Sequence, residues 1–297
     1  MTTSAIEAIN LSKSFGSLTA VDGLNLEVDA GEVVGFLGPN GAGKSTTLRL
    51  LLGLLRPTSG EARLLGHPAG SEFARRHVAY VPGDVALWPQ LTGREAIALL
   101  AQLHGSSDDA YRDELIRRFE LDPEKRIRAY SKGNRQKVAI VAAFATRAEV
   151  LLLDEPTSGL DPLMERAFRD CIVEAADRGQ AVLLSSHMLS EVEHLCARVA
   201  MIRAGRLVTV ADIADLRSHV GLEFDIVGDV GDLRGVDGVE SVTPMSDGVR
   251  VRVQGPPGPL LAALATRPVL SLRSREASLE EIFLSYYDGD PAPAPSL

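Results

Sequence analysis

Two hydrophobic patterns open this chain, and they predict two kinds of strand. In residues 18–28, Leu24, Leu26 and Val28 alternate with polar neighbours, as in a strand with one buried face. Residues 6–15 have a similar character, and Gly16-Ser17 separates the two runs. Residues 33–37 are instead a continuous apolar run, which is typical of a strand buried on both faces. The sequence therefore predicts an antiparallel β-subdomain leading into a buried strand.

Helical and strand patterns then alternate through most of the chain. Amphipathic helices are predicted at 45–55, 94–104, 108–121, 133–147, 162–178 and 189–197. Strands are predicted at 150–153 and 181–185, and a hairpin at 199–210 that turns at Ala204-Gly205. The alternation indicates an α/β fold with a largely parallel sheet, interrupted by a helical subdomain at about 88–147.

The pattern changes beyond about residue 216. Strands are predicted at 222–227, 239–243, 249–253 and 269–273, with helices near 232–235 and 259–266. This order resembles a β-α-β-β-α-β unit and predicts a small α+β domain at 216–287, after a first domain at 1–215. We interpret the small domain as a regulatory or dimer-stabilising module. Ser278-x-x-Glu281 is a capping-box pattern for a last helix with Ile282 and Phe283 on its apolar face. The Pro- and Ala-rich segment 288–297 is predicted to be a disordered tail.

Composition narrows the class of protein. The 297 residues are 45% hydrophobic and 24% charged, as in globular proteins. We expect no membrane span, because no apolar run approaches the roughly 20 residues required, and no signal peptide is visible. The formal net charge of -9 argues against binding nucleic acid. Cys171 and Cys196 have no metal-ligand spacing, so we predict buried, reduced thiols in a cytoplasmic protein.

A phosphate-binding loop follows the first buried strand. Its residues are Gly38, Pro39, Asn40, Gly41, Ala42, Gly43, Lys44, Ser45 and Thr46, which fit G-x-x-x-x-G-K-[ST] between a strand and a helix. Such a loop turns backbone N–H groups toward a nucleotide's phosphates. Lys44 is expected to reach the β- and γ-phosphates, and the Ser45 hydroxyl to ligate Mg²⁺. The alternative is a Gly-rich turn that caps a helix.

Two acids follow the next apolar strand. Asp154 and Glu155 come directly after residues 150–153, at the carboxyl end where open parallel sheets bind ligands. Asp154 is expected to hold Mg²⁺, directly or through water. Glu155 is positioned to polarise the water that attacks the γ-phosphate. The alternative is that the two acids cap the next turn.

From residue 6 to about 210 the chain resembles the ATP-binding subunits of ABC transporters. Residues 130–137 (YSKGNRQK) match the family's signature segment, residues 158–161 its D-loop, His187 its switch histidine and Phe15 its adenine-stacking aromatic. The resemblance implies a P-loop NTPase of the ABC ATPase type, binding ATP with Mg²⁺.

Each matching residue also has a simpler explanation. Ser131 and Asp161 are plausible helix N-caps, with Pro162 at the first helical position. His187 could be a satisfied polar residue after a strand, and Phe15 a core aromatic. Jointly, the order and spacing favour the family.

The resemblance implies that two such subunits pair head to tail in an ATP-dependent homodimer. Ser131, Gly133 and Asn134 of one subunit then complete the ATP site of the other, where His187 contacts the γ-phosphate and the attacking water. Lys44, Glu155 and His187 are the implied catalytic residues. A separate integral membrane permease is the implied partner, which places the chain peripherally on the inner face of the cell membrane.

Two positions depart from the family's pattern. Gly83 stands where the family has the Q-loop glutamine, and Asp84 or Gln90 are candidate substitutes. Lys132 replaces the first signature glycine. It would either add positive charge near the phosphates or point to solvent, and we favour solvent because lysine is costly to bury. These variants, together with residues 277–284, resemble the daunorubicin/doxorubicin-resistance type of exporter ATPase.

The leading hypothesis is therefore the ATPase subunit of an exporter for a drug, antibiotic or lipid-like compound. A second class is a non-transport ABC ATPase of the translation or DNA-repair type. Duplicated cores or a long coiled-coil insertion would favour that class, and neither is visible. A third class is a regulatory module that does not hydrolyse ATP, which the presence of Glu155 and His187 disfavours.

Overall fold

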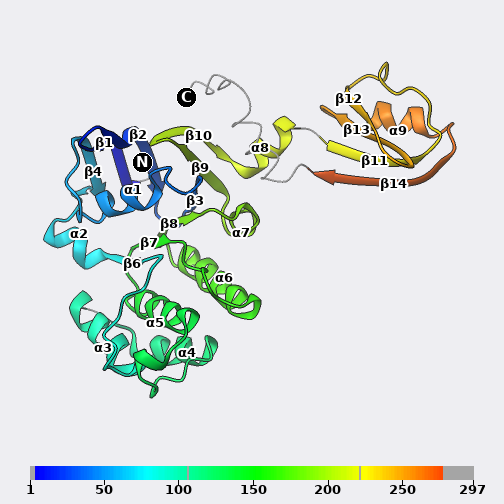
Figure 1. The fold of residues 1–297 in the computed structure, drawn as a ribbon. Helices are drawn as coiled ribbons and strands as arrows, with labels where there is room; N and C mark the ends of the chain where they lie inside the picture. Colours follow the sequence, from blue (N-terminus) through cyan, green and yellow to red (C-terminus); the bar gives the residue numbers. More distant parts are fainter. Residues whose placement is uncertain (1–3, 106, 221, 277–297) are drawn as a thin grey trace. The chain divides into compact units, whose positions relative to one another are not determined.

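The computed structural model describes residues 4–105, 107–220 and 222–276, which form two compact units dividing between Val210 and Ala211 (Figure 1). The sequence places this boundary slightly later, between residues 215 and 216. The difference arises at α8 (Ile213–Val220), a helix that the sequence did not predict and that belongs to the second unit. The helix and tail expected after Ser278 lie outside the described residues.

Two sheets form the framework of the first unit. The antiparallel sheet has the order β2-β1-β4-β5, with strands β1 (Ser4–Phe15), β2 (Leu18–Asp29), β4 (Ser59–Leu64) and β5 (His67–Pro68). The larger sheet has the order β10-β9-β3-β8-β7-β6. Its strands are β3 (Val33–Leu37), β6 (Val78–Val81), β7 (Val150–Asp154), β8 (Ala181–Ser186), β9 (Arg198–Arg203) and β10 (Arg206–Asp212). Strands β9, β3, β8, β7 and β6 pair in parallel, as the sequence predicts.

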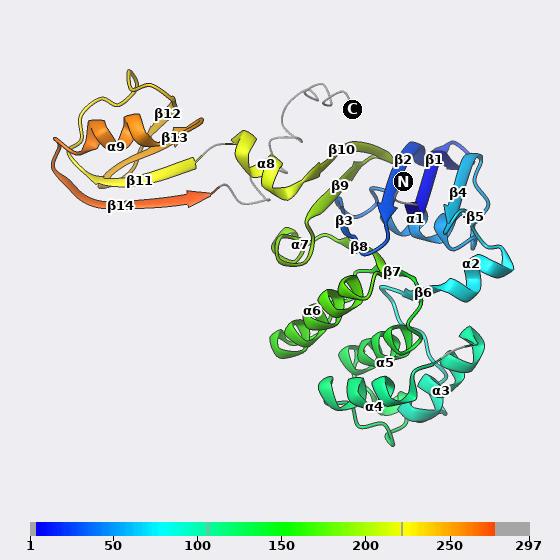
Figure 2. The same cartoon turned by 180° about the vertical axis from the view of Figure 1, so that it is seen from behind.

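Helices accompany the two sheets of the first unit. They are α1 (Lys44–Leu51), α2 (Glu72–His77), α3 (Gly93–His104), α4 (Asp109–Arg118), α5 (Lys132–Ala145), α6 (Pro162–Asp177) and α7 (Leu189–Leu195). Helix α1 lies between the two sheets, contacting β7 as well as β1, β2 and β4, whereas α6 and α7 pack on β8 (Figure 2). Helix α1 ends earlier than predicted, since Gly53 adopts a φ of 71°.

Burial explains why the strand patterns differ. Every residue of β7 and β8 is buried, so these strands are continuous apolar runs up to their last polar residues. In β2, by contrast, Leu24, Leu26 and Val28 are buried while the residues between them are exposed. The turn between β9 and β10 has positive φ at both Ala204 (48°) and Gly205 (81°), which suits a tight hairpin.

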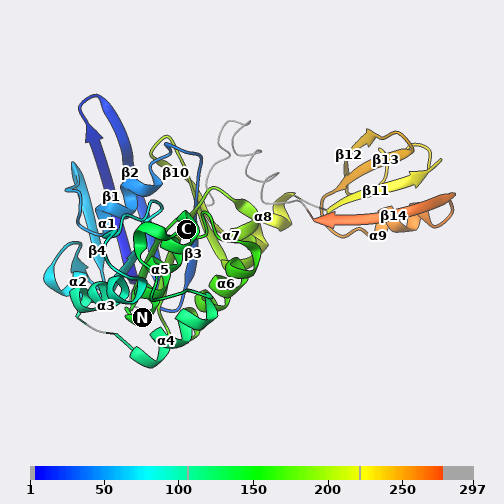
Figure 3. The same ribbon diagram turned by 60° about the horizontal axis from the view of Figure 1, so that its bottom comes forward.

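Helices α3, α4 and α5 gather into the predicted helical subdomain (Figure 3). Helix α3 begins at a capping box in which Thr92 and Glu95 exchange side chain–backbone hydrogen bonds. Helix α5 packs against α6, where the Phe144 and Phe168 rings meet edge to face with centroids 6.0 Å apart. Cys171 and Cys196 are both buried, as expected, and no disulfide joins them.

The second unit contains one four-stranded antiparallel sheet in the order β12-β13-β11-β14. After α8, its elements are β11 (Leu222–Gly228), β12 (Val239–Pro244), β13 (Gly248–Val253), α9 (Gly258–Leu264) and β14 (Val269–Glu276). Leu260 and Leu264 of α9 belong to the same apolar core as Phe224 and Ile226 of β11.

The helix predicted near residues 232–235 is wrong. Turns occupy this segment, and Gly231 and Gly238 have φ of 62° and 81°. The Arg234 N–H donates to Oδ1 of Asp232 at 3.0 Å, a local bond that competes with helix formation. Among the described residues, none of the helices is both long and apolar enough to cross a membrane.

Candidate nucleotide-binding site

The phosphate loop lies between the carboxyl end of β3 and the start of α1, as the motif requires. Close packing against two strands explains its glycines. A Cβ at Gly43 would come 2.4 Å from the Ala20 carbonyl oxygen, and φ there is 112°. A Cβ at Gly38 would come 2.4 Å from the Ile202 carbonyl oxygen. The loop is therefore held between β2 and β9, with Pro39, Asn40 and Gly41 exposed.

Lys44 is the buried cation of this loop. Its Nζ donates to the carbonyls of Gly38 at 2.7 Å and Pro39 at 3.3 Å, and lies 3.7 Å from Oε1 of Glu155. Burial lowers the pKa of Lys44, while the negative charges of Glu155 and Asp154 oppose that shift. The ammonium group thus stands between the loop and the acidic pair. Ser45 and Thr46 follow in the first turn of α1, where both are half-buried.

Asp154 ends β7 and is buried beside β8. Its Oδ1 accepts a 2.6 Å hydrogen bond from the hydroxyl of Ser185. Burial, followed by the charge of Asp154, raises the pKa of Tyr80 to about 12. The sequence did not predict that Ser185 and Tyr80 lie beside Asp154. A polar residue ending the apolar run of β8 was the available signal for Ser185.

Glu155 adopts a left-handed backbone conformation, with φ of 47°. Its N–H donates to the carbonyl of Ser185 at 3.0 Å and to the hydroxyl of the same residue at 3.2 Å. Its Oε2 lies 3.2 Å from Nδ1 of His187. The carboxylate therefore contacts Lys44 and His187, whereas the turn that follows is closed by a backbone bond from Ser158 N–H to the Glu155 carbonyl. Turn capping does not require these contacts of the carboxylate, and the catalytic roles of Glu155 and His187 stay predictions.

A pocket of about 220 Å³ adjoins this pair. Glu155 and His187 line one part of it, and Ser158 and Gly159 of the D-loop another. Within the ranges that the structure describes, no cluster of three or more His, Cys, Asp or Glu side chains is arranged to hold a metal. A cation at Asp154 would thus depend on hydroxyl, phosphate and water oxygens.

The signature segment begins at an N-cap. The Asn134 N–H donates to Oγ of Ser131 at 3.2 Å, so the cap explanation of Ser131 is correct, and Asp161 likewise caps α6. Lys132 is exposed, as expected, and its Nζ also donates to Oγ of Ser158 at 3.0 Å. Contacts of Ser131, Gly133 and Asn134 with a second subunit's ATP stay a prediction.

Phe15 is not a core aromatic. Its side chain is 48% exposed at the end of β1, and Nζ of Lys13 lies 5.0 Å from the ring centroid. An exposed ring is available for stacking on a base, which remains the prediction for this residue.

Gly83 packs directly against the acid of β7. A Cβ at Gly83 would lie 3.1 Å from the Asp154 carbonyl oxygen, so even a methyl group would press on the strand end. The buried Gln136 of α5 reaches the same segment, donating to the Pro82 carbonyl at 3.5 Å. The sequence did not predict this contact between Gln136 and the segment that contains Gly83. Substitution of the Q-loop glutamine by Asp84 or Gln90 stays a prediction.

These features define a P-loop nucleoside triphosphatase: a phosphate loop at the end of one parallel strand beside an acidic pair at the end of another. A sequence profile described as "ABC transporter" matches residues 21–158. The daunorubicin/doxorubicin resistance ATP-binding protein DrrA of Streptomyces peucetius is 39% identical over 74% of this chain and 68% of its own. The Nod factor export ATP-binding protein I of Burkholderia orbicola is 33% identical over 96% of this chain and 97% of its own. The chain belongs to the ATP-binding subunits of ABC transporters, and it is an ATPase.

Solved structures agree with this assignment. The structure of an ATP-binding subunit of an ABC transporter superposes with a TM-score of 0.68 at 32% identity, over 72% of this chain and 92% of that one. The dimeric structure of the bacterial cassette MJ0796 has a TM-score of 0.65 at 23% identity, over 70% and 98% of the two chains, and shows the shared fold.

Proposed function

We propose that this chain hydrolyses ATP to power an exporter, working as an ATP-dependent homodimer on a separate integral membrane permease. This role places the chain peripherally on the cytoplasmic face of the cell membrane. The names of two relatives refer to drug resistance and to Nod factor export, which supports export of a drug, antibiotic or lipid-like compound.

The main support for the proposed mechanism of ATP hydrolysis is the position of Glu155 between Lys44 and His187. The Glu155 carboxylate is the general base that orients and polarises the attacking water. Lys44 neutralises charge on the β- and γ-phosphates, and His187 holds the γ-phosphate and the water. The loop's backbone N–H groups and the start of α1 bind the remaining phosphate oxygens.

Mg²⁺ fits the donors at this edge of the sheet. Ser45 supplies a hydroxyl and Asp154 a carboxylate, and Mg²⁺ prefers such oxygen ligands completed by water and phosphate. Ser185 fixes the Asp154 carboxylate through its 2.6 Å hydrogen bond. Bound Mg²⁺ would neutralise charge on the phosphates.

Homodimer formation is supported by the exposed N-terminus of α5. Its first turn carries no acidic residue, so the positive end of the helix dipole is available to an anion. In the proposed dimer, Ser131, Gly133 and Asn134 contact the γ-phosphate that is bound to the other subunit's phosphate loop.

The decisive test is Glu155→Gln. The amide cannot act as the general base, so we expect kcat for ATP hydrolysis to fall about 100-fold or more while ATP binding persists. The variant should also accumulate as an ATP-bound dimer in size-exclusion chromatography. Glu149→Gln, next to the opposite end of β7, is the matched control and should behave as the wild type. Hydrolysis at the wild-type rate by Glu155→Gln would overturn the assignment.

Copurification tests the transport role. The tagged chain, isolated from native membranes in mild detergent, should bring down an integral membrane permease identified by mass spectrometry. A wash at high pH should release the chain from membranes, as expected for a peripheral protein. Recovery of the chain with soluble partners alone would count against transport.

A further inference from the structure

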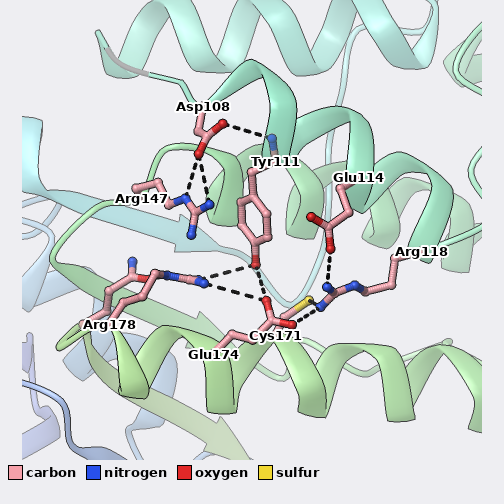
Figure 4. A network of polar contacts seen from close by, with 9 residues as sticks. Asp108, Tyr111, Glu114, Arg118, Arg147, Cys171, Glu174 and Arg178 are labelled. Atoms are coloured by element: carbon pink, nitrogen blue, oxygen red, sulfur yellow. Dashed lines mark hydrogen bonds and ion pairs between the residues drawn. The ribbon is translucent and has the colours of Figure 1, made fainter.

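Helix α6 and the segment just before it contact the helical subdomain at three places. At its middle, Phe168 meets Phe144 of α5. Toward its C-terminus, Glu174 accepts hydrogen bonds from Arg118 of α4 at 2.7 Å and from the Tyr111 hydroxyl at 3.1 Å (Figure 4). Just before its N-terminus, Ser158 accepts the bond from Lys132. Because α6 begins at the D-loop and α5 at the signature segment, these contacts join two functional segments of one chain.

The contact near the C-terminus of α6 is a polar cluster. Arg118 also donates to Glu114 at 2.5 Å and to Sγ of Cys171 at 3.4 Å. The Arg147 guanidinium lies over the Tyr111 ring, 3.7 Å from its centroid (Figure 4). Shared partners make such a cluster cooperative, so it fixes how α4 lies against α6.

The contact near the N-terminus of α6 is much sparser. A Cβ at Gly133 would come 2.3 Å from the Gly159 carbonyl oxygen, so the two backbones approach closely. The methylenes of Lys132 lie over Gly159, since a Cβ there would meet Cδ of Lys132 at 3.7 Å. Beyond this backbone approach, the Lys132–Ser158 hydrogen bond links the signature segment to the D-loop.

The helix dipole explains why the Lys132 side chain points away from the axis of α5. Lys132 is the first residue of α5, and a cation there is repelled by the positive end of the helix. The Ser158 hydroxyl offers its ammonium group an acceptor away from the helix axis. The space in front of the helix N-terminus therefore stays open to a phosphate.

The D-loop continues directly to the catalytic carboxylate. The Ser158 N–H donates to the Glu155 carbonyl at 3.1 Å, and the Leu160 N–H to the Thr157 carbonyl at 2.9 Å. One residue, Ser158, thus bonds to Lys132 through its side chain and to Glu155 through its backbone. These two bonds connect the signature segment to Glu155, which has a left-handed backbone conformation.

We propose that Lys132 is a positioning residue that couples the two ATP sites of the dimer. Resting on the proposed function, the inference is that γ-phosphate bound by one subunit's signature segment moves that subunit's D-loop through Lys132 and Ser158. The movement aligns Glu155 at the other ATP. Lys132 itself does not contact phosphate.

Hydrogen–deuterium exchange on the nucleotide-free full chain tests the contact without dimer or turnover. Lys132→Met keeps the methylenes but loses the donor, and Ser158→Ala loses the acceptor. Both should speed exchange of the 157–161 amides about three- to ten-fold, the effect of losing one hydrogen bond. Lys132→Arg should restore protection, and Lys125→Met, an exposed lysine of the same subdomain, should leave it unchanged. Unaltered exchange in Lys132→Met would overturn the contact.

Steady-state hydrolysis tests the coupling. Lys132→Met and Ser158→Ala should each lower kcat several-fold at unchanged KM for ATP and reduce the Hill coefficient toward 1. The kcat of the double variant should be no lower than that of either single variant.

A raised KM in Lys132→Met with wild-type behaviour in Ser158→Ala would mean that Lys132 contacts phosphate, which overturns the proposal. Wild-type kinetics in both variants would overturn the coupling too. A wild-type chain that never dimerises with ATP would instead refute the proposed function, and the exchange result would still stand.

Discussion

Nδ1 of His187 lies 3.2 Å from Oε2 of Glu155, although the two residues are far apart in the chain. Glu155 follows β7 and His187 follows β8, and these neighbouring strands run parallel. Their carboxyl ends therefore deliver both side chains to the same edge of the sheet. The pairing gives the imidazole a partner that holds it beside the carboxylate that we propose as the general base.

The first prediction concerns this histidine. His187→Ala should lower kcat for ATP hydrolysis about 100-fold with little change in ATP affinity, because the imidazole is expected to act on the γ-phosphate and water rather than on the bound nucleotide as a whole. Steady-state hydrolysis and binding of a fluorescent ATP analogue measure the two quantities. His67→Ala, which changes an exposed histidine stacked on Phe73, is the control. An unchanged kcat in His187→Ala would remove His187 from the mechanism.

Lys44→Ala should separate binding from stability. Loss of charge-assisted hydrogen bonds to the phosphates should raise the Kd for ATP about ten- to hundred-fold. The melting temperature of the nucleotide-free chain should not fall, since burial of the Lys44 ammonium is unfavourable enough to lower its pKa. Calorimetric titration and thermal melting test both statements, with Lys125→Ala as the control. A large drop in melting temperature would show that Lys44 is mainly structural.

Gly43 should tolerate no side chain. Gly43→Ala places Cβ 2.4 Å from the Ala20 carbonyl oxygen and forces alanine to a φ of 112°, so the loop must shift and ATP binding should weaken more than ten-fold. Gly41→Ala is the matched variant, because φ is also positive (80°) but no heavy atom lies within 4 Å of the new Cβ. We expect its loss of affinity to be smaller. Equal losses in the two variants would contradict the clash.

Glu174→Gln should reveal a pH-dependent contribution to stability. Burial raises the pKa of Glu174, but hydrogen bonding and charge from Arg118 outweigh it, so the pKa falls below its usual 4.5. A lowered pKa stabilises the fold above about pH 4.5, and this contribution is lost as the pH falls through the folded-state pKa.

The carboxylate is partly exposed, so we expect Glu174→Gln to lower the free energy of unfolding by roughly 0.5–1 kcal/mol at pH 7. Urea unfolding at pH 7 and near pH 4 provides the measurement. The difference between variant and wild type should shrink at the lower pH. A difference that grows on acidification would have the wrong sign for this ion pair.

Local signals predicted most of the fold. The continuous apolar runs gave β3, β7 and β8, because strands buried on both faces carry no polar alternation. Capping residues marked the starts of α5 and α6 correctly. The helix expected near residues 232–235 failed, because the glycines at 231 and 238 favour turns over a short helix.

The amino-acid sequence by itself determined the phosphate loop, the acidic pair and the family, since these depend on residue type and spacing along the chain. Only the tertiary structure decided which distant groups meet: Ser185 with Asp154, His187 with Glu155, and Lys132 with Ser158. Such contacts depend on how parallel strands and packed helices align in space. A hydrogen bond forms only within about 3.5 Å, a condition that no local pattern encodes.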